Sequence, residues 1–184
     1  MSARLVQLSK FLSLMLRHEP AKFGLVLDPE GFVPLADAML AINRQFPQAT
    51  SADVVAVVGT IEPDKQRFTI VEGDIRANYG HSLAERVAQA AMQPPQVLIH
   101  GTNERAVGTI LRDGLRPMKR QYVHMTPDAA LAELVGARRG KPVLISVDAH
   151  AAHLAGVVFY RANDSFWLAD AIPASYLRLL PAGK

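Results

Sequence analysis

The chain has 184 residues, of which 49% are hydrophobic and 20% charged, and its formal net charge is +3. It contains no cysteine, which excludes disulfides, thiolate metal sites and a cysteine nucleophile. Because it shows neither an apolar run of membrane-spanning length nor the pattern of a signal peptide, we expect a cytoplasmic protein with no membrane partner.

The charge is distributed unevenly along the chain. Residues 1–93 carry nine Lys or Arg and ten Asp or Glu, a balance of −1, whereas residues 94–184 carry eleven and seven, a balance of +4. Four basic residues fall within one short segment: Arg112, Arg116, Lys119 and Arg120. Such a segment suits an anionic ligand or an RNA backbone, although a solvated surface has the same composition.

The first apolar residues recur at helical spacing: Leu5, Leu8, Leu12 and Met15. This stripe predicts an amphipathic helix that ends before Pro20. Arg17 and His18 then lie in its last turn, where a cation complements the helix dipole. The dipole accounts for the positive charge there but not for the adjacent imidazole.

Several short elements are expected next. Runs at 25–27 and 32–33 around a turn predict a small hairpin, and apolar spacing predicts a helix over 35–46. Thr50 followed by Asp53 indicates the start of another helix. Segments 67–71 and 75–77 predict a two-stranded wing, and the alanine-rich segment 83–92 predicts a helix. This order is typical of a winged-helix module, which we place in residues 1–93.

Residues 94–184 are predicted to form a β-rich second lobe, which makes the whole chain α+β with two lobes. A buried strand at 97–99 leads into His100, Gly101 and Thr102, and a helix over 103–112 should stop at Gly114. We expect a strand at 122–125, a helix capped by Thr126 and running over 127–137, and strands at 143–147, 157–160, 166–168 and 176–180.

Segment 75–82 combines groups suited to handling phosphate. Arg76 offers a fixed fork of donors, His81 can move a proton near neutral pH, and Gly80 allows a close backbone approach. Two further clusters also favour an anion, namely Arg17 with His18, and 100–102 with Arg138. The three clusters are predicted to converge on one phosphate-binding cleft.

Six ordered blocks together resemble the RNA 2′-phosphotransferase family. They are the following segments: 16–18 before Pro20, 76–82, 100–102, 114–115, 123–124, and Arg138 with 140–142. The resemblance implies a winged-helix RNA-binding lobe and a lobe of the ADP-ribosyltransferase fold that binds NAD. It also implies an enzyme that removes an internal 2′-phosphate from RNA, in tRNA splicing or RNA repair. NAD is consumed, no metal is needed, and we expect a monomer.

The implied reaction passes through 2′-phospho-ADP-ribosyl RNA and releases nicotinamide and ADP-ribose 1″,2″-cyclic phosphate. When the motifs of the family are matched to this sequence, its catalytic residues correspond to Arg17, His18, Arg76 and Arg138. The resemblance places the RNA phosphate on these four residues together with His81 and Ser82. It places NAD on His100, Gly101, Thr102, Gly114, Leu115 and His124. Val157 stands where many ADP-ribosyltransferases have a glutamate, and Tyr122 stands where this family often has histidine.

Other interpretations remain open from the residues. A winged-helix regulator of nucleic acid would leave His100 and His124 unexplained. An ADP-ribosyltransferase acting on protein would leave Arg17, His18 and Arg76 without a role, and one acting on nucleic-acid phosphate ends is a further alternative. His150 and His153 have the spacing of a metal pair, but surface or core histidines are favoured because no third ligand accompanies them. The aromatic residues of 159–167 are favoured as core rather than as base-stacking groups.

Overall fold

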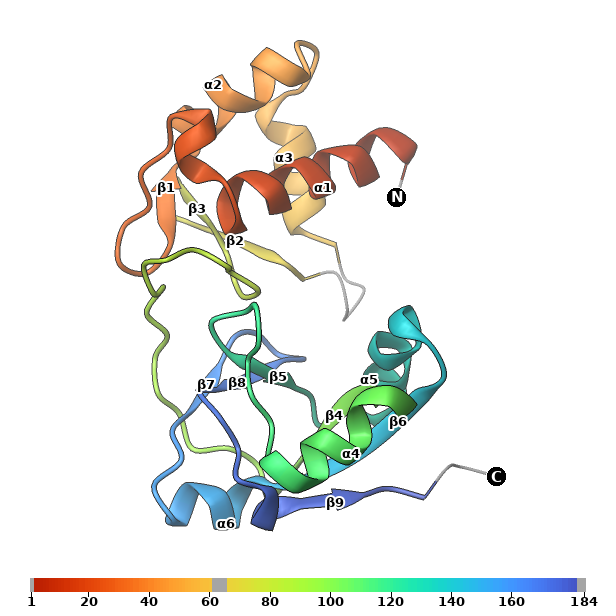
Figure 1. The fold of residues 1–184 in the computed structure, drawn as a ribbon. Helices are drawn as coiled ribbons and strands as arrows, with labels where there is room; N and C mark the ends of the chain where they lie inside the picture. The colour runs from red at the N-terminus through yellow and green to blue at the C-terminus, as the bar shows by residue number, and fades with distance from the viewer. Residues whose placement is uncertain (1, 61–65, 182–184) are drawn as a thin grey trace. The chain divides into compact units, whose positions relative to one another are not determined.

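The computed structural model describes residues 2–60 and 66–181 and shows a mixed α+β architecture with small antiparallel sheets (Figure 1). The chain divides into two compact units, Met1–Ala88 and Gln89–Lys184. We call them unit 1 and unit 2. None of the helices within the described residues is long and apolar enough to cross a membrane.

Unit 1 contains three α-helices: α1 (Ala3–Arg17), α2 (Leu35–Gln45) and α3 (Ser51–Val58). A short 3-10 helix, η1 (Pro20–Phe23), follows α1. The Ser2 hydroxyl accepts a hydrogen bond from the Leu5 amide and begins α1, while Thr50 and Asp53 form a reciprocal capping box at the start of α3. The three helices predicted from periodicity and capping are therefore confirmed.

The sheet of unit 1 has three antiparallel strands in the order β1-β3-β2. They are β1 (Phe32–Pro34), β2 (Phe68–Val71) and β3 (Asp74–Ala77). The hairpin between β2 and β3 turns through Glu72 and Gly73, whose φ angles of 51° and 90° suit the right-handed twist of a tight hairpin. The predicted two-stranded wing is present, and β1 adds a third strand to it.

The core of unit 1 lies between α1, α3 and one face of this sheet, and Figure 1 shows the two helices beside it. The stripe of α1 is buried as expected, because Leu8, Leu12 and Met15 are at most 2% exposed. On the sheet, Ile75 and Ala77 are fully buried against the helices. Since side chains alternate along a strand, Arg76 between them lies on the opposite face.

Two predictions for unit 1 and its boundary are wrong. Residues 25–27 form no strand, because β1 pairs with β3 instead and the Asp28 carboxylate closes the preceding turn by accepting the amides of Glu30 and Phe32. Segment 83–92 forms no helix, because the amides of Ala88 and Met92 donate to distant carbonyls, those of Pro29 and Phe159. Tertiary hydrogen bonds thus override the helical propensity of alanine.

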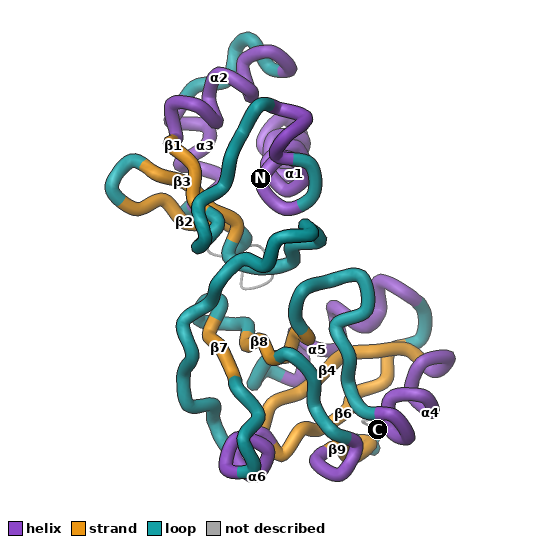
Figure 2. Tube along the Cα trace, turned by 60° about the vertical axis from the view of Figure 1, so that its left-hand side comes forward, coloured by secondary structure: helices purple, strands orange, loops and turns teal. Residues whose placement is uncertain are grey.

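Unit 2 has two antiparallel sheets of three strands each, in the orders β4-β6-β9 and β5-β8-β7 (Figure 2). The first contains β4 (Val97–Asn103), β6 (Pro142–Asp148) and β9 (Leu177–Leu179). The second contains β5 (Val123–Met125), β7 (Phe159–Arg161) and β8 (Trp167–Ala169). The sheets are linked by mutual backbone hydrogen bonds between Ile99 and Thr126, of 2.7 and 3.0 Å.

Three α-helices accompany these sheets: α4 (Glu104–Asp113), α5 (Ala129–Gly136) and α6 (Ala149–Leu154). The 3-10 helices η3 (Ala137–Arg139) and η4 (Ala174–Tyr176) follow α5 and precede β9. The predicted strands are present, but β4 and β6 are longer than expected and the others are shorter or shifted by one or two residues. Helix α6 was not predicted. The aromatic residues Phe159 and Trp167 belong to the core, as favoured from the sequence.

Two details of unit 2 differ from expectation. Thr126 does not cap α5, because its backbone is paired with Ile99; Asp128 is the cap and accepts the amides of Ala130 and Leu131. The strand expected to end at His100 continues to Asn103, because β4 pairs with β6 over its whole length. The division between units falls after Ala88, whereas the sequence placed a boundary after residue 93.

Helix α5 lies directly on β4 because two glycines face each other. A Cβ on Gly101 would stand 1.9 Å from the Ala132 carbonyl oxygen, and one on Gly136 would stand 2.8 Å from the Thr102 carbonyl oxygen. Both distances are far below van der Waals contact, and the opposing atoms are backbone, which cannot rotate away. The two backbones can therefore approach this closely only while both positions are glycine.

We predict that Gly101→Ala lowers the free energy of unfolding by about 3 kcal/mol, because the added methyl group must displace the α5 backbone. Gly108→Ala is the matched control, since a Cβ there meets nothing within 4 Å inside α4. It should instead stabilise the protein by about 0.5–1 kcal/mol. Urea unfolding followed by circular dichroism measures both, and equal stability of the two variants would contradict the close approach.

Candidate active site

The end of α1 and the loop after β3 are tied together in unit 1. The Ser82 amide donates to the Arg17 carbonyl over 3.0 Å, and the Ser82 hydroxyl lies 2.8 Å from His18 Nδ1. His18 is the C-terminal cap of α1, and its own amide donates to the Leu14 carbonyl. Ser82 is thus a neighbour of Arg17 and His18 in the structure, although it lies 64 residues beyond His18 in the sequence.

The Arg17 guanidinium is held between two aromatic rings. It lies 5.0 Å from the centre of the Tyr79 ring and 5.5 Å from that of Phe68, and its Nη2 donates to the Arg67 carbonyl over 3.3 Å. The residue is only 7% exposed. Aromatic faces and a carbonyl fix the direction of a guanidinium, so this cation is oriented before any ligand arrives.

Arg76 is oriented by the register of the sheet. It stands opposite Phe32 across the β1–β3 pair, its guanidinium lies 4.8 Å from the Phe32 ring centre, and Nη1 donates to the Glu30 carbonyl over 3.3 Å. Its Nε is buried and has no acceptor within residues 2–60 and 66–181. The side chain lies on the face of the sheet opposite to Phe68, because Phe68 pairs with Ala77 and Arg76 pairs with Thr69.

His81 is an interior residue in this structure, because only 1% of its surface is exposed. It packs beside Gly31, where a Cβ would meet His81 Nε2 at an ordinary contact distance of 3.6 Å; the close approach at this glycine is to Val87 Cγ1, at 2.9 Å. The neighbouring Asn78 is also buried and accepts from the Thr69 hydroxyl over 2.7 Å. The loop that carries Ser82 is thus anchored by buried polar side chains.

In unit 2, His100 is fixed by the backbone of the neighbouring sheet. Its Nδ1 lies 2.8 Å from the His124 carbonyl oxygen, which can only accept, so Nδ1 carries the proton. Burial lowers the pKa of His100, and the hydrogen bond to His124 opposes that shift. The neutral ring therefore predominates at neutral pH, with a lone pair at Nε2.

Arg138 is placed near the end of β4 through the glycine contact described above. It is exposed on η3, which continues α5 directly beyond Gly136. Because Gly136 packs on Thr102, η3 contacts the end of β4. Thr102 itself is 9% exposed. The structure thus brings the 100–102 block and Arg138 into one region of unit 2.

The presence of Gly114 and Leu115 at these positions can be explained by packing alone. Gly114 has φ of 86°, and a Cβ there would stand 2.4 Å from the Ile172 carbonyl oxygen. Leu115 and Ile172 exchange backbone hydrogen bonds of 2.8 and 3.0 Å. The two residues join the end of α4 to the segment before η4, which accounts for the glycine without a ligand.

The remaining candidates are not arranged for catalysis. No group of three or more His, Asp or Glu that could hold a metal occurs among the described residues. His153 stacks edge-on against Phe159 and its Nδ1 lies 3.4 Å from the Val157 carbonyl, so it packs within the unit. Val157 is half-buried and precedes β7. Tyr122 is 5% exposed and packs edge-on against Tyr160.

The sequence did not indicate the aromatic and carbonyl partners that orient the arginines. Tyr79 and Phe68 were noted only as a motif position and a strand residue, yet both contact the Arg17 guanidinium. A signal was present for Phe32, because it begins a strand and aromatic residues are common cross-strand neighbours. Predicting that Phe32 pairs with Arg76 would have required the strand register, which the sequence of such short strands does not specify.

Comparison with known proteins places these residues in a family context. The profile of the family described as RNA 2′-phosphotransferase, Tpt1/KptA family, matches residues 3–171. A protein of Agrobacterium fabrum named "Probable RNA 2′-phosphotransferase" is 46% identical, over 92% of this chain and 91% of its own length. Proteins of the same name from Streptomyces griseus subsp. griseus and Acetivibrio thermocellus are 43% and 42% identical, covering 96% and 94% of this chain and 97% and 95% of their own lengths.

The lowered pKa of His100 predicts a stability change in acid. The unfolded chain takes up a proton near pH 6.5 that the folded chain resists, so stability falls as the pH drops below about 6.5. His100→Asn keeps an N–H donor for the His124 carbonyl but does not titrate. Between pH 7 and pH 5, the parent should therefore lose more unfolding free energy than the variant, with a difference of at most about 1.4 kcal/mol per pH unit.

Urea unfolding at a series of pH values measures this difference. Above pH 7.5 the two proteins should show the same pH dependence, which serves as the internal control. Parallel curves throughout the acid range would mean that His100 is not protected from protonation.

Proposed function

Because the chain belongs to the RNA 2′-phosphotransferase, Tpt1/KptA family, we propose that it removes an internal 2′-phosphate from RNA with NAD as the phosphate acceptor. The observation that carries this proposal is the cluster of Arg17, His18 and Ser82. It offers a fixed guanidinium and an imidazole at the end of one helix, which suits a phosphate dianion.

We assign unit 1 to RNA binding as a winged-helix lobe and unit 2 to NAD binding as an ADP-ribosyltransferase-like lobe. The order of α1, β1, α2, α3 and the β2–β3 hairpin supports the first assignment. Two small antiparallel sheets joined at Ile99 and Thr126 support the second. We further propose that the enzyme is a cytoplasmic monomer acting in tRNA splicing or RNA repair.

His18 and Ser82 define where a proton is held. When the Ser82 hydroxyl donates to Nδ1, the neutral imidazole carries its proton on Nε2 and can donate it to a phosphate oxygen. Arg17 adds a charged donor fixed by its aromatic neighbours. Together they would position the RNA phosphate for attack, with Arg76 and Arg138 supplying further guanidinium groups.

Among the residues that we assign to NAD, some can contact it directly, whereas two glycines cannot. The neutral His100 ring, held through Nδ1, avoids repulsion with the positively charged nicotinamide ring. We place His100, Thr102 and His124 in direct contact with NAD. Gly101 and Gly114 act through packing, because the space beside each is filled by a protein carbonyl.

The proposed chemistry has two steps. A 2′-phosphate oxygen of RNA attacks the nicotinamide-bearing ribose carbon of NAD, whose bond to nicotinamide breaks. The adjoining ribose hydroxyl then attacks phosphorus, and the bond to the RNA 2′-oxygen breaks. The products are RNA with a 2′-hydroxyl, nicotinamide and ADP-ribose 1″,2″-cyclic phosphate. A phosphate is already ionised at neutral pH, so no carboxylate base is required at Val157.

The proposed function is tested by incubating the protein with NAD and an RNA oligonucleotide that carries one internal 2′-phosphate. We expect nicotinamide to be released only when that phosphate is present, together with conversion of the RNA to the 2′-hydroxyl form. The same oligonucleotide without the phosphate is the control. RNA binding without turnover would favour a regulator, and nicotinamide release without a 2′-phosphate would favour another ADP-ribosyltransferase.

We predict that Arg17→Ala and Arg138→Ala slow the second step more than the first. Charge develops on the phosphoryl oxygens when phosphorus is attacked, and loss of one fixed donor costs about a hundredfold in rate. RNA joined to ADP-ribose through its 2′-phosphate should then accumulate as a slower band in single-turnover gels.

Arg44→Ala is the matched control, since Arg44 is an exposed arginine in the last turn of α2. Because Arg17 is buried, circular dichroism must first show that its variant is folded, and Arg17→Lys should have intermediate activity. Folded variants that lose all activity without this band would place the arginines in phosphate binding or in the first step.

A further inference from the structure

A cavity of about 400 Å³ lies in unit 2 at the beginning of β4. Its lining includes Val97, Ser146, Asp148, His150, Tyr176 and Arg178. They come from β4, β6, α6, η4 and β9. His100 and Thr102 do not line it, and Thr102 is five residues further along β4, which corresponds to about 17 Å of strand.

The register explains why this cavity exists. Val97 pairs with Asp148, and Ser146 pairs with Arg178, so these four side chains share one face of the β4-β6-β9 sheet. Gly101 belongs to the same face, and α5 covers that end through its contact with Ala132. Helix α5 does not extend over the other end. The uncovered end is bordered by α6 and η4, and it forms the cavity.

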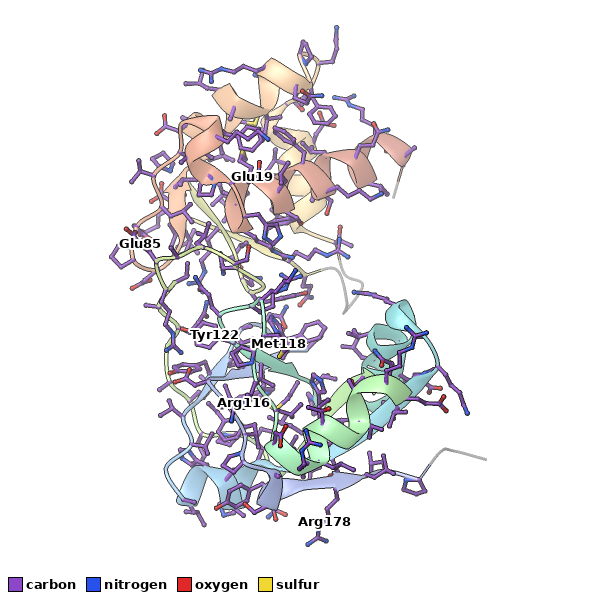
Figure 3. All side chains as sticks on the ribbon, viewed as in Figure 1. Glu19, Glu85, Arg116, Met118, Tyr122 and Arg178 are labelled. Carbon is purple, nitrogen blue, oxygen red and sulfur yellow. The ribbon has the colours of Figure 1, made fainter. Side chains whose placement is uncertain are left out.

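Several polar side chains of the cavity have no hydrogen-bond or ion-pair partner among the described residues. Ser146, His150, Tyr176 and Arg178 make no side-chain hydrogen bond or ion pair within the part of the chain that the structure describes. Asp148 uses Oδ1 to accept the Ala151 amide over 3.0 Å, which leaves Oδ2 unused. Figure 3 shows Arg178 extending from β9 into solvent, where it can reach an incoming anion.

We propose that this cavity binds a nucleoside monophosphate unit. Arg178 and Ser146 suit the phosphate, the free oxygen of Asp148 suits ribose hydroxyl groups, and the Tyr176 ring with Val97 suits the flat face of a base. The volume falls within the range of about 300–1,000 Å³ of sites for small ligands. A guanidinium can bind an anionic group and a nearby carboxylate can accept from hydroxyl groups, so the pair matches a ligand that carries both.

The proposed site is distinct from the candidate active site, and it does not depend on the proposed function. Its residues are not among those that the family resemblance assigns to RNA phosphate or to NAD. The same chemistry is present in a free mononucleotide and in one unit of an RNA chain. Binding experiments with each ligand distinguish these two sources, and they require no turnover.

Titration with AMP, followed by calorimetry and by ligand-observed NMR, tests the site. Arg178→Ala should weaken AMP binding about tenfold or more, because it removes a charged hydrogen bond. Ala151→Leu keeps Arg178 but fills part of the cavity from α6, and it should also weaken binding. Arg105→Ala, an exposed arginine of α4 outside the cavity, is the matched control and should bind AMP as the parent does.

His100→Asn separates this site from the candidate active site, and it too should retain AMP binding. Loss of AMP binding in His100→Asn with full binding in Arg178→Ala would overturn the proposal, as would no binding of either AMP or RNA. Displacement of AMP by a short RNA without a 2′-phosphate would identify an RNA unit as the ligand. AMP binding that this RNA does not displace would identify a free nucleotide.

Discussion

The contact between β4 and α5 is the constraint on which unit 2 depends. Two backbones meet at Gly101 and Gly136 with no side chain between them, so the helix axis is fixed relative to the strand. This single contact sets the position of η3 and therefore of Arg138, beside the strand that carries His100 and Thr102. It also determines how far α5 covers the sheet, and so leaves the opposite end of the same face open.

Unit 1 achieves its arrangement by a different physical means. Two of its arginines contact aromatic rings and donate to backbone carbonyls: Arg17 contacts Tyr79 and Phe68, and Arg76 contacts Phe32. A carboxylate partner would hold a guanidinium equally well but would neutralise its attraction for phosphate. Aromatic faces orient the group at little electrostatic cost. Aromatic contacts therefore suit the phosphate-binding role that we propose for these side chains.

Much of the fold was predictable where local chemistry decides it. The stripe of α1, the Thr50 and Asp53 capping box and the tight β2–β3 turn each have a signal within a few residues. Segment 83–92 was mispredicted because its amides bond to carbonyls far away in the sequence, which propensity does not register. For the candidate site, the family resemblance grouped Arg17, His18 and Ser82 with Arg76, His81 and Arg138, and the structure brings the first three together. The packing roles of Gly101 and Gly114 required the positions of Ala132 and Ile172.

The arrangement of β9 bears on how copies of this chain behave in solution. It is an edge strand of the β4-β6-β9 sheet, and exposed edges can pair with another molecule and lead to aggregation. Here the strand has only three residues, and Arg178 stands at its centre. A short edge with a central charge gives a second strand few hydrogen bonds and brings like charges together in a symmetric antiparallel pair. The same guanidinium that borders the open face of the sheet thus also opposes self-association along its edge.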